Sequence, residues 1–212
     1  MTIVIATGEE LIVNANQYPD LWWALRGGGG GTFGVLTSVT YISHPVTPLI
    51  AGYFSVTIDS PVKGKTEALK KLVTELLRIT PQLAEAGWGG YPTIEPHAVT
   101  GVPSLGFMML APNVSWAKAN ESLNPFFAFA QSVAASSSYE DGGAVTVNAA
   151  FTKELESFNA WETAWWRKIG LVGNSVTGNN VIVGSRMFTE ATIREKYIEL
   201  GDEISEYYGC GF

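Results

Sequence analysis

A run of five glycines, Gly27–Gly31, constrains this chain of 212 residues more than any other feature. Ordering so many glycines costs backbone entropy, so such a run is favoured where the backbone must approach another group closely. The residues before it, PDLWWALR, predict a short helix, because Pro19 suits a first helical position and Asp20 suits the positive end of the helix dipole. Arg26 and Gly27 fit the last turn and the cap of that helix. The β-branched residues that follow predict a strand over 34–42.

The order of these elements argues against a Rossmann nucleotide site. Gly29, Gly31 and Gly34 fit the pattern G-x-G-x-x-G, but that fingerprint follows a strand and begins a helix, whose N-terminus holds the pyrophosphate. Here a helix comes first and a strand follows. Two interpretations stay open: a tight loop that lets the helix pack against a sheet, or a loop that lets a ligand approach the backbone.

Composition excludes several classes of function. With 46% hydrophobic and 16% charged residues, the chain is predicted to form a packed core. A net charge of −7 and only 13 Lys and Arg residues argue against a nucleic-acid partner. No apolar run reaches the ~18 residues of a membrane span, so no membrane partner is expected, and the first residues lack the pattern of a signal peptide. The single cysteine, Cys210, excludes a cysteine metal cluster, and we predict no metal site.

The pattern of strands and helices predicts an α+β fold in two parts. A hairpin over residues 2–13 opens the chain, and the prolines of SHPVTP, residues 43–48, mark a boundary. We therefore expect one unit over 1–45 and another over 46–212. In the second unit we expect a sheet with helices mainly on one face. The expected strands are 50–58, 87–96, 104–112, 143–151 and 180–188; the expected helices are 65–79, 116–135 with a break at Pro125, one capped by Thr152, and one capped by Thr192 and Glu195.

The stretch NQYPDLWWALRGGGGGTFGVLTSVTYISHP, residues 16–45, resembles the signature of a known enzyme family. It is similar to the FAD-linked oxidoreductases of the vanillyl-alcohol-oxidase superfamily, whose FAD-binding domain is of the PCMH type, and most of all to the fungal berberine-bridge-enzyme-like branch. The resemblance implies that residues 1–45 are the C-terminal part of that FAD-binding domain. It implies that residues 46–212 are a substrate-binding domain with an antiparallel sheet backed by helices.

The resemblance also implies a cofactor, FAD, and residues that meet it. The matching positions are Gly30, Gly31, Thr32, Gly34, Val35 and Leu36. Strands of the second unit offer candidates for a substrate pocket, with core packing or ordinary exposure as the competing interpretation for each: Tyr91, Phe107, Met109 and Arg186. No catalytic residue is assigned, because the acids Glu95 and Asp59 have no evident second group to act with.

Relative to the family, the chain is expected to be an internal fragment. It starts after the subdomain that grips the pyrophosphate and stops before the segment that completes the FAD domain. We therefore expect the chain alone to hold FAD poorly. A surface around Ile3, Ile5, Val35 and Val39 is expected to be exposed and to bind a missing N-terminal FAD subdomain or a second copy.

Two functions remain in view from the sequence. The first is an FAD-dependent oxidoreductase that transfers hydride to flavin from a small alcohol, a sugar or a secondary-metabolite precursor. The second is a catalytically inactive α+β module, derived from such an enzyme, that binds or interacts. Two sequons, Asn113-Val114-Ser115 and Asn120-Glu121-Ser122, would permit glycosylation if the protein is secreted.

Overall fold

The structure is a computed structural model that describes residues 1–29, 31–59, 67–96, 103–140, 143–166 and 186–209. The chain divides after Pro45 into two compact units, Met1–Pro45 and Val46–Phe212. Each unit is described by itself below. None of the described helices is long and apolar enough to cross a membrane.

The first unit is a small antiparallel sheet with one helix. Strands β1 (Thr2–Val4) and β2 (Glu10–Ile12) form the predicted hairpin, and β3 (Val35–Ser38) pairs with the other edge of β1. Helix α1 (Pro19–Gly28) has its proline at the start, as predicted. Four buried side chains make the core between sheet and helix: Ile3, Leu11, Val13 and Leu25.

Three expectations for this unit need correction. The helix ends two residues later than expected: Gly29, with a φ of 83°, is its cap, and its N–H donates to the Leu25 carbonyl. Strand β3 is shorter than the predicted 34–42. Ile3 is buried rather than exposed, because its pairing with Leu11 and Leu36 turns it toward α1. Val35 is 68% exposed, whereas Ile5 and Val39 are half-buried.

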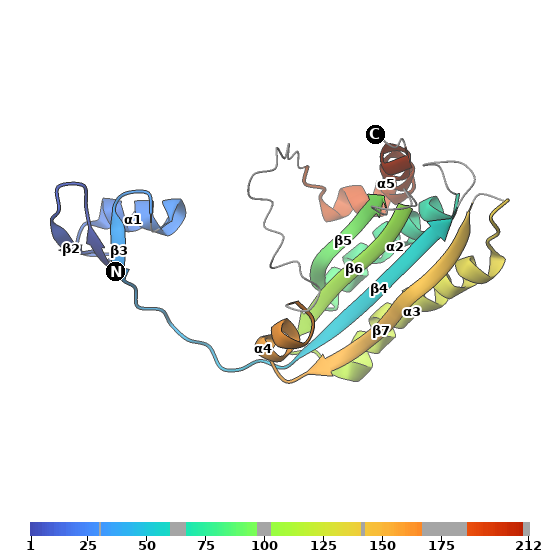
Figure 1. Ribbon diagram of the computed structural model, residues 1–212, viewed down its shortest axis with the longest axis horizontal. Helices are drawn as coiled ribbons and strands as arrows, with labels where there is room; N and C mark the ends of the chain where they lie inside the picture. Colours follow the sequence, from blue (N-terminus) through green and yellow to red (C-terminus); the bar gives the residue numbers. More distant parts are fainter. Residues whose placement is uncertain (30, 60–66, 97–102, 141–142, 167–185, 210–212) are drawn as a thin grey trace. The chain divides into compact units, whose positions relative to one another are not determined.

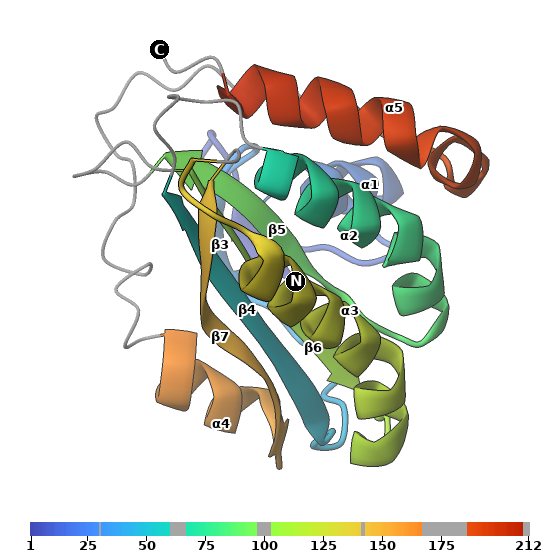
Figure 2. The same cartoon turned by 90° about the vertical axis from the view of Figure 1, so that its right-hand side faces the viewer.

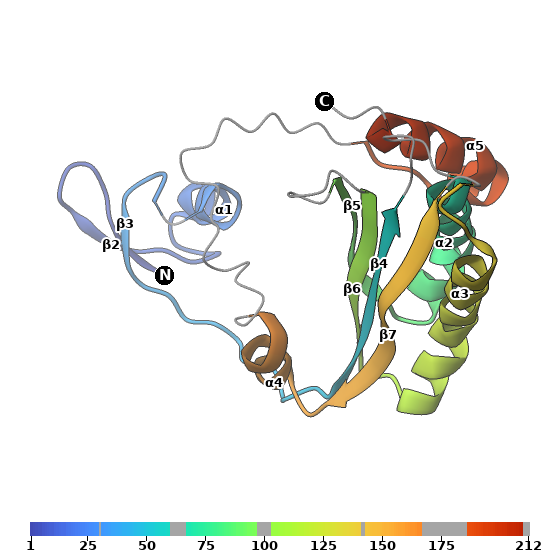
Figure 3. The ribbon, with the colours of Figure 1, turned by 45° about the vertical axis from the view of Figure 1, so that its right-hand side comes forward.

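The second unit is built on a four-stranded antiparallel sheet in the order β5-β6-β4-β7 (Figure 1). Its strands are β4 (Leu49–Asp59), β5 (Gly89–Pro96), β6 (Pro103–Pro112) and β7 (Ala144–Leu155). Helices α2 (Glu67–Glu85) and α3 (Trp116–Ser136) cover one face, as Figures 2 and 3 show. The short helix α4 (Phe158–Trp161), continued by the π-helical segment η1 (Glu162–Trp166), lies beyond the other face.

The main core lies between the sheet and its two covering helices. Leu69, Leu72 and Leu76 of α2 are buried there, so the predicted apolar stripe faces the sheet. Phe54 of β4 packs edge-on against Phe126 of α3, with 4.9 Å between ring centroids. The α+β class and the antiparallel sheet backed by helices are therefore as predicted.

Helix α3 runs without a break through Pro125, contrary to expectation. Proline removes one backbone donor, which leaves the carbonyl four residues earlier without its helical partner. Pro125 and Glu121 both lie on the exposed side of the helix, where water can satisfy that carbonyl. On the opposite side, Leu123 and Phe126 are fully buried against the sheet, and this packing holds one continuous helix.

Residues 152–155 form strand rather than the predicted start of a helix. Strand β7 continues to Leu155 because β4 is long enough to pair with it as far as Leu49. Thr152 lies in this strand, and its hydroxyl donates to Asn120 Oδ1 at 2.7 Å. The cap of α4 is Ser157, whose Oγ accepts from the Ala160 N–H at 3.0 Å.

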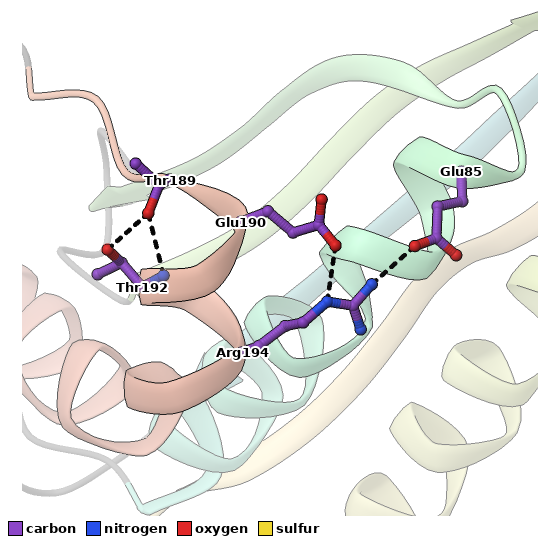
Figure 4. A network of polar contacts seen from close by, with 5 residues as sticks. All are labelled: Glu85, Thr189, Glu190, Thr192 and Arg194. Carbon is purple, nitrogen blue, oxygen red and sulfur yellow. Dashed lines mark hydrogen bonds and ion pairs between the residues drawn. The ribbon is translucent and has the colours of Figure 1, made fainter.

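The last helix, α5 (Glu190–Gly209), begins before the predicted cap at Thr192. Thr189 Oγ1 accepts from the Thr192 N–H at 3.1 Å. Arg194 joins the helix to α2 by donating to Glu85 at 2.7 Å, and it also donates to Glu190 of its own helix at 2.7 Å (Figure 4). Of the strand expected over 180–188, residues 180–185 lie outside the described residues and 186–188 are irregular.

Replacing Leu72 by Ala tests the packing of α2 on the sheet. Leu72 is fully buried, so the truncation should lower the free energy of unfolding by about 2–5 kcal/mol, from lost burial and the remaining cavity. Urea denaturation followed by circular dichroism measures it. Lys71→Ala, at the exposed neighbouring position, is the matched control and should change stability by less than about 0.5 kcal/mol. Equal effects of the two substitutions would contradict the assignment.

Candidate functional site

Some glycines of the loop between α1 and β3 are explained by the fold itself. Gly29 takes a left-handed conformation that favours glycine. A Cβ on Gly34 would collide with the Val4 carbonyl oxygen and lie 2.9 Å from Ile3 Cγ1. Gly34 is therefore required by its own sheet, as the tight-loop interpretation predicts.

Gly27 and Gly31 differ from these. A Cβ at either position would meet no described atom within 4 Å, and Gly27 has no positive φ. Packing among the described residues therefore does not require glycine at these two positions. The interpretation as a ligand-facing loop depends on Gly27 and Gly31.

The other predicted cofactor residues are placed differently from one another. Thr32 is exposed, and its hydroxyl donates to the Gly28 carbonyl, which ties the loop to the helix end. Val35 is exposed at the start of β3, whereas Leu36 is half-buried in the core of the first unit. Gly30 lies outside the described residues.

The loop follows the C-terminal end of α1, where the helix dipole is negative. That end disfavours an anion such as phosphate. Arg26, in the last turn, has its guanidinium 5.5 Å from the ring centroid of Trp22, so the cation lies against the helix's own aromatic side chain. The end of α1 therefore lacks the features of a phosphate site.

In the second unit, α2 and α3 cover one face of the sheet, and among the described residues the other face is covered by α4 alone (Figure 3). We call this second face the open face. Paired residues of antiparallel strands point to the same face. The register pairs Tyr53 with Met108 and Phe151, and Met108 with Tyr91. Four side chains therefore form one row across all four strands, from β5 to β7, which we call the open-face row: Tyr91, Met108, Tyr53 and Phe151.

Exposure differs strongly along the open-face row. Tyr53 is 6% exposed, Phe151 38% and Tyr91 82%. The Tyr53 and Phe151 rings lie 5.1 Å apart, centroid to centroid, at 31°. Trp161 from α4 is buried in the same cluster, and exposed Phe158 lies 5.1 Å from it. The result is a row of aromatic and thioether groups that is exposed at both ends, at Tyr91 and Phe151, and buried at Tyr53 between them.

Burial raises the pKa of Tyr53 to about 12, and the neighbouring Trp161 side chain partly offsets the rise. The indole N–H is only a donor, so it favours the phenolate, whereas burial disfavours it. The effect of burial on the pKa is the larger one, so the phenol is protonated at neutral pH.

Two of the four predicted pocket residues lie on the wrong face for this surface. Phe107 and Met109 are buried in the helix-side core, and Phe107 stacks on Phe54 at 5.2 Å. Side chains alternate along a strand, so Met108 between them is the residue that faces outward. Tyr91 belongs to the open-face row. Arg186 is exposed in the irregular segment before α5, and no described contact joins it to that row.

Sequence reasoning missed Tyr53, Met108 and Phe151. Alternation within β4 and β6 divides each strand into two sets, but it does not say which set the helices cover. The acids considered for catalysis stay unassigned: Asp59 is exposed at the end of β4, and the Glu95 side chain lies outside what is described.

Neither of two further hollows in the described part of the unit contains a predicted site residue. A crevice of about 700 Å³ lies between the end of α2 and the start of α3. A smaller hollow of about 280 Å³ is lined by side chains of α2, α3 and α5. Within the described ranges, no three His, Cys, Asp or Glu side chains gather as a metal site would require.

No protein-family model matches the chain, but curated relatives do. The FAD-linked oxidoreductase penH of Penicillium thymicola is 56% identical over 81 residues, which are 38% of this chain and 14% of that protein. An uncharacterised FAD-linked oxidoreductase of Arthroderma benhamiae is 30% identical over the whole chain and 34% of its own length. The FAD-linked oxidoreductase phmC of Phaeosphaeria nodorum is 28% identical over 96% of the chain and 40% of its own length.

Solved structures show the same fold. The VAO-type flavoprotein MtVAO713 of Myceliophthora thermophila superposes with a TM-score of 0.61 and 20% identity, over 96% of this chain and 34% of that one. MtVAO615 from the same organism gives 0.60, over 97% and 33%. The resemblance drawn from residues 16–45 is thus confirmed at the level of the VAO type. The chain is thus similar in sequence to FAD-linked oxidoreductases and in fold to VAO-type flavoproteins, and it spans 34–40% of the length of the curated relatives that match it almost end to end.

Proposed function

We propose that this chain supplies a flavin-facing loop and a substrate-facing sheet to an FAD-dependent oxidoreductase. The observation that carries the proposal is the bare backbone at Gly27 and Gly31, which packing among the described residues does not require. The names of the curated relatives support FAD as the cofactor. When bound, FAD would supply the hydride acceptor, and the protein would position the substrate carbon.

The loop would face the uncharged ring system of the flavin rather than its pyrophosphate. A phosphate group needs converging donors, and a helix N-terminus supplies them. Gly27 and Gly28 instead form the negative end of α1, and Gly29 and Gly31 come after it. We therefore infer that the chain alone binds FAD weakly, through the loop, and that residues 1–45 act as part of an FAD-binding domain.

Residues 46–212 would act as the substrate domain, with the open-face row as the surface that meets the substrate. Of the substrate classes considered, the row favours an aromatic or otherwise apolar alcohol over a sugar. Tyr91, Phe151 and Phe158 expose ring area, and Met108 adds a polarisable thioether. A sugar requires many hydrogen-bonding partners, and within the row only the two tyrosine hydroxyls could provide them.

Tyr53 would serve as a neutral hydrogen-bonding group in this surface. Its pKa of about 12 keeps the hydroxyl protonated over the physiological pH range, so Tyr53 is unsuited to act as a base there. We assign it the task of orienting a substrate oxygen, and the base stays unassigned.

Titration of ¹⁵N-labelled chain with FAD tests the role of the loop. The amide signals of Gly27, Gly31 and Thr32 should shift, with an affinity weaker than micromolar. Gly31→Val should reduce the shifts, because a side chain would hold the flavin off the backbone. Gly89→Val is the matched control, since Gly89 also has open space around its Cβ position but lies in the second unit.

Two outcomes would oppose this prediction in different ways. Tight binding of one flavin per chain would show that the loop and its unit form a complete cofactor site. Shifts that leave residues 27–32 unchanged would remove the flavin role of the loop and favour an inactive binding module.

Titration with benzyl alcohol and with glucose tests the substrate surface. Benzyl alcohol should shift the signals of Tyr53, Met108 and Phe151, and glucose at the same concentration should not. Phe151→Ala should weaken the response because it removes exposed ring area. Trp116→Ala, at an aromatic residue of α3 with 52% exposure, is the control and should leave the response unchanged. A response to glucose in the open-face row would contradict the preference.

The alkaline titration of Tyr53 tests its environment. A folded-state pKa of about 12 lies above the unfolded value near 10, so the stabilisation is complete below pH 10 and is lost as the pH rises toward 12. The free energy of unfolding should therefore fall more steeply above pH 10 in the wild-type chain than in Tyr53→Phe. Identical slopes for the wild type and Tyr53→Phe would refute the buried phenol.

A further inference from the structure

The two sequons of the chain lie seven residues apart but in different structural settings. Asn113 follows the end of β6, and Asn120 lies in the second turn of α3. Sequence alone gives them the same pattern, Asn-x-Ser without proline at the middle position. Glycans require an exposed asparagine with room for a bulky, hydrophilic group, so the fold can distinguish the two sites.

Asn113 has the geometry of an acceptor. It lies in the turn between β6 and α3, it is exposed, and its φ of 59° places it in the left-handed region typical of turns. Its backbone N–H donates to the Pro48 carbonyl at 2.9 Å, which holds the turn in place. No described hydrogen bond engages its side-chain amide. Ser115, the third sequon residue, is exposed at the N-cap of α3.

Asn120 is engaged through both ends of its side-chain amide. Nδ2 donates to the Trp116 carbonyl at 3.0 Å, and Oδ1 accepts from the Thr152 hydroxyl at 2.7 Å. The second bond links α3 to β7 across the core, and Asn120 is half-buried. A sugar on Nδ2 would have to fit beside the helix while the amide stays fixed. Turning the amide outward would break both bonds.

The surroundings of Asn113 also suit a sugar. It lines the crevice of about 700 Å³ between α2 and α3, together with polar side chains that include Lys118 and Glu121. This crevice belongs to the helix layer, whereas the open-face row is on the opposite face of the sheet. A glycan at this position would therefore leave the open-face row uncovered.

We propose that Asn113 is a site of N-linked glycosylation and that Asn120 is not. When the chain passes through a secretory pathway, it acquires one glycan, on the turn before α3. The engaged amide of Asn120 is a structural tie between α3 and β7. This assignment does not depend on the proposed oxidoreductase function, because it concerns the opposite face of the second unit.

Expression of the full chain behind a cleavable secretion leader in yeast tests the assignment. The soluble, folded protein, from medium or lysate, is treated with a glycan-releasing amidase, and peptide mass spectrometry locates the converted asparagine. We expect conversion at Asn113 and none at Asn120. The mass shift on release should be abolished by Asn113→Gln and unchanged in Asn120→Gln. Ser115→Thr keeps the helix cap and the sequon, so it should keep or raise occupancy.

Thermal unfolding separates the role of Asn113 as a glycan acceptor from the structural role of Asn120. Asn120→Gln should lower the thermal midpoint of unfolding, because the longer side chain loses its bond to Thr152, whereas Asn113→Gln should leave the midpoint of the deglycosylated protein unchanged. A glycan found on Asn120 in folded protein would overturn the proposal. An unmodified Asn113 in folded protein that has entered the secretory pathway would also overturn it.

Discussion

Strand β4 and its pairing on both sides determine the arrangement of the second unit. All eleven of its residues pair with β7, and nine of them also pair with β6. Because paired residues share a face, this one register decides which side chains of three strands enter the core. Ile50, Phe54 and Val56 go to the helices, while Tyr53 and its partners go to the opposite side. The extra residue accommodated in β7 opposite Ser55 and Val56 keeps Val145 and Val147 on the helix side.

The helix side of the sheet depends on close packing that small residues permit. A Cβ on Gly52 would lie 2.6 Å from Leu123 of α3 and 3.1 Å from Trp88, so both side chains occupy the space above that position. Trp88 in turn donates its indole N–H to Ser122 at 2.8 Å. These contacts bring α3 close to β4 and bury the aromatic groups of the helix face. In the part of the chain that the structure describes, α4 alone lies over the open face, and Tyr91 and Phe151 are exposed there.

The glycine run shows how one sequence feature can have several physical causes. Gly29 ends a helix, Gly34 avoids a clash inside its own sheet, and Gly27 and Gly31 have no such internal constraint among the described residues. The tight-loop interpretation accounts for Gly29 and Gly34, whereas the ligand-facing interpretation stays a prediction for Gly27 and Gly31. Experiments on the ligand role can therefore concentrate on these two positions.

Local sequence located most of the elements and carried the resemblance to FAD-linked oxidoreductases. Apolar spacing located α2, β-branched alternation located β4, and the residues around the glycine run carried the resemblance that the relatives confirm. Tertiary structure decided what depends on distant partners. Pairing with β4 extended β7 through Thr152–Leu155. Burial of Leu123 and Phe126 kept α3 continuous across Pro125. Alternation along β6 put Phe107 in the helix-side core and Met108 on the opposite face. Periodicity divides a strand into two faces, but only the packing of helices on one of them decides which face is the core.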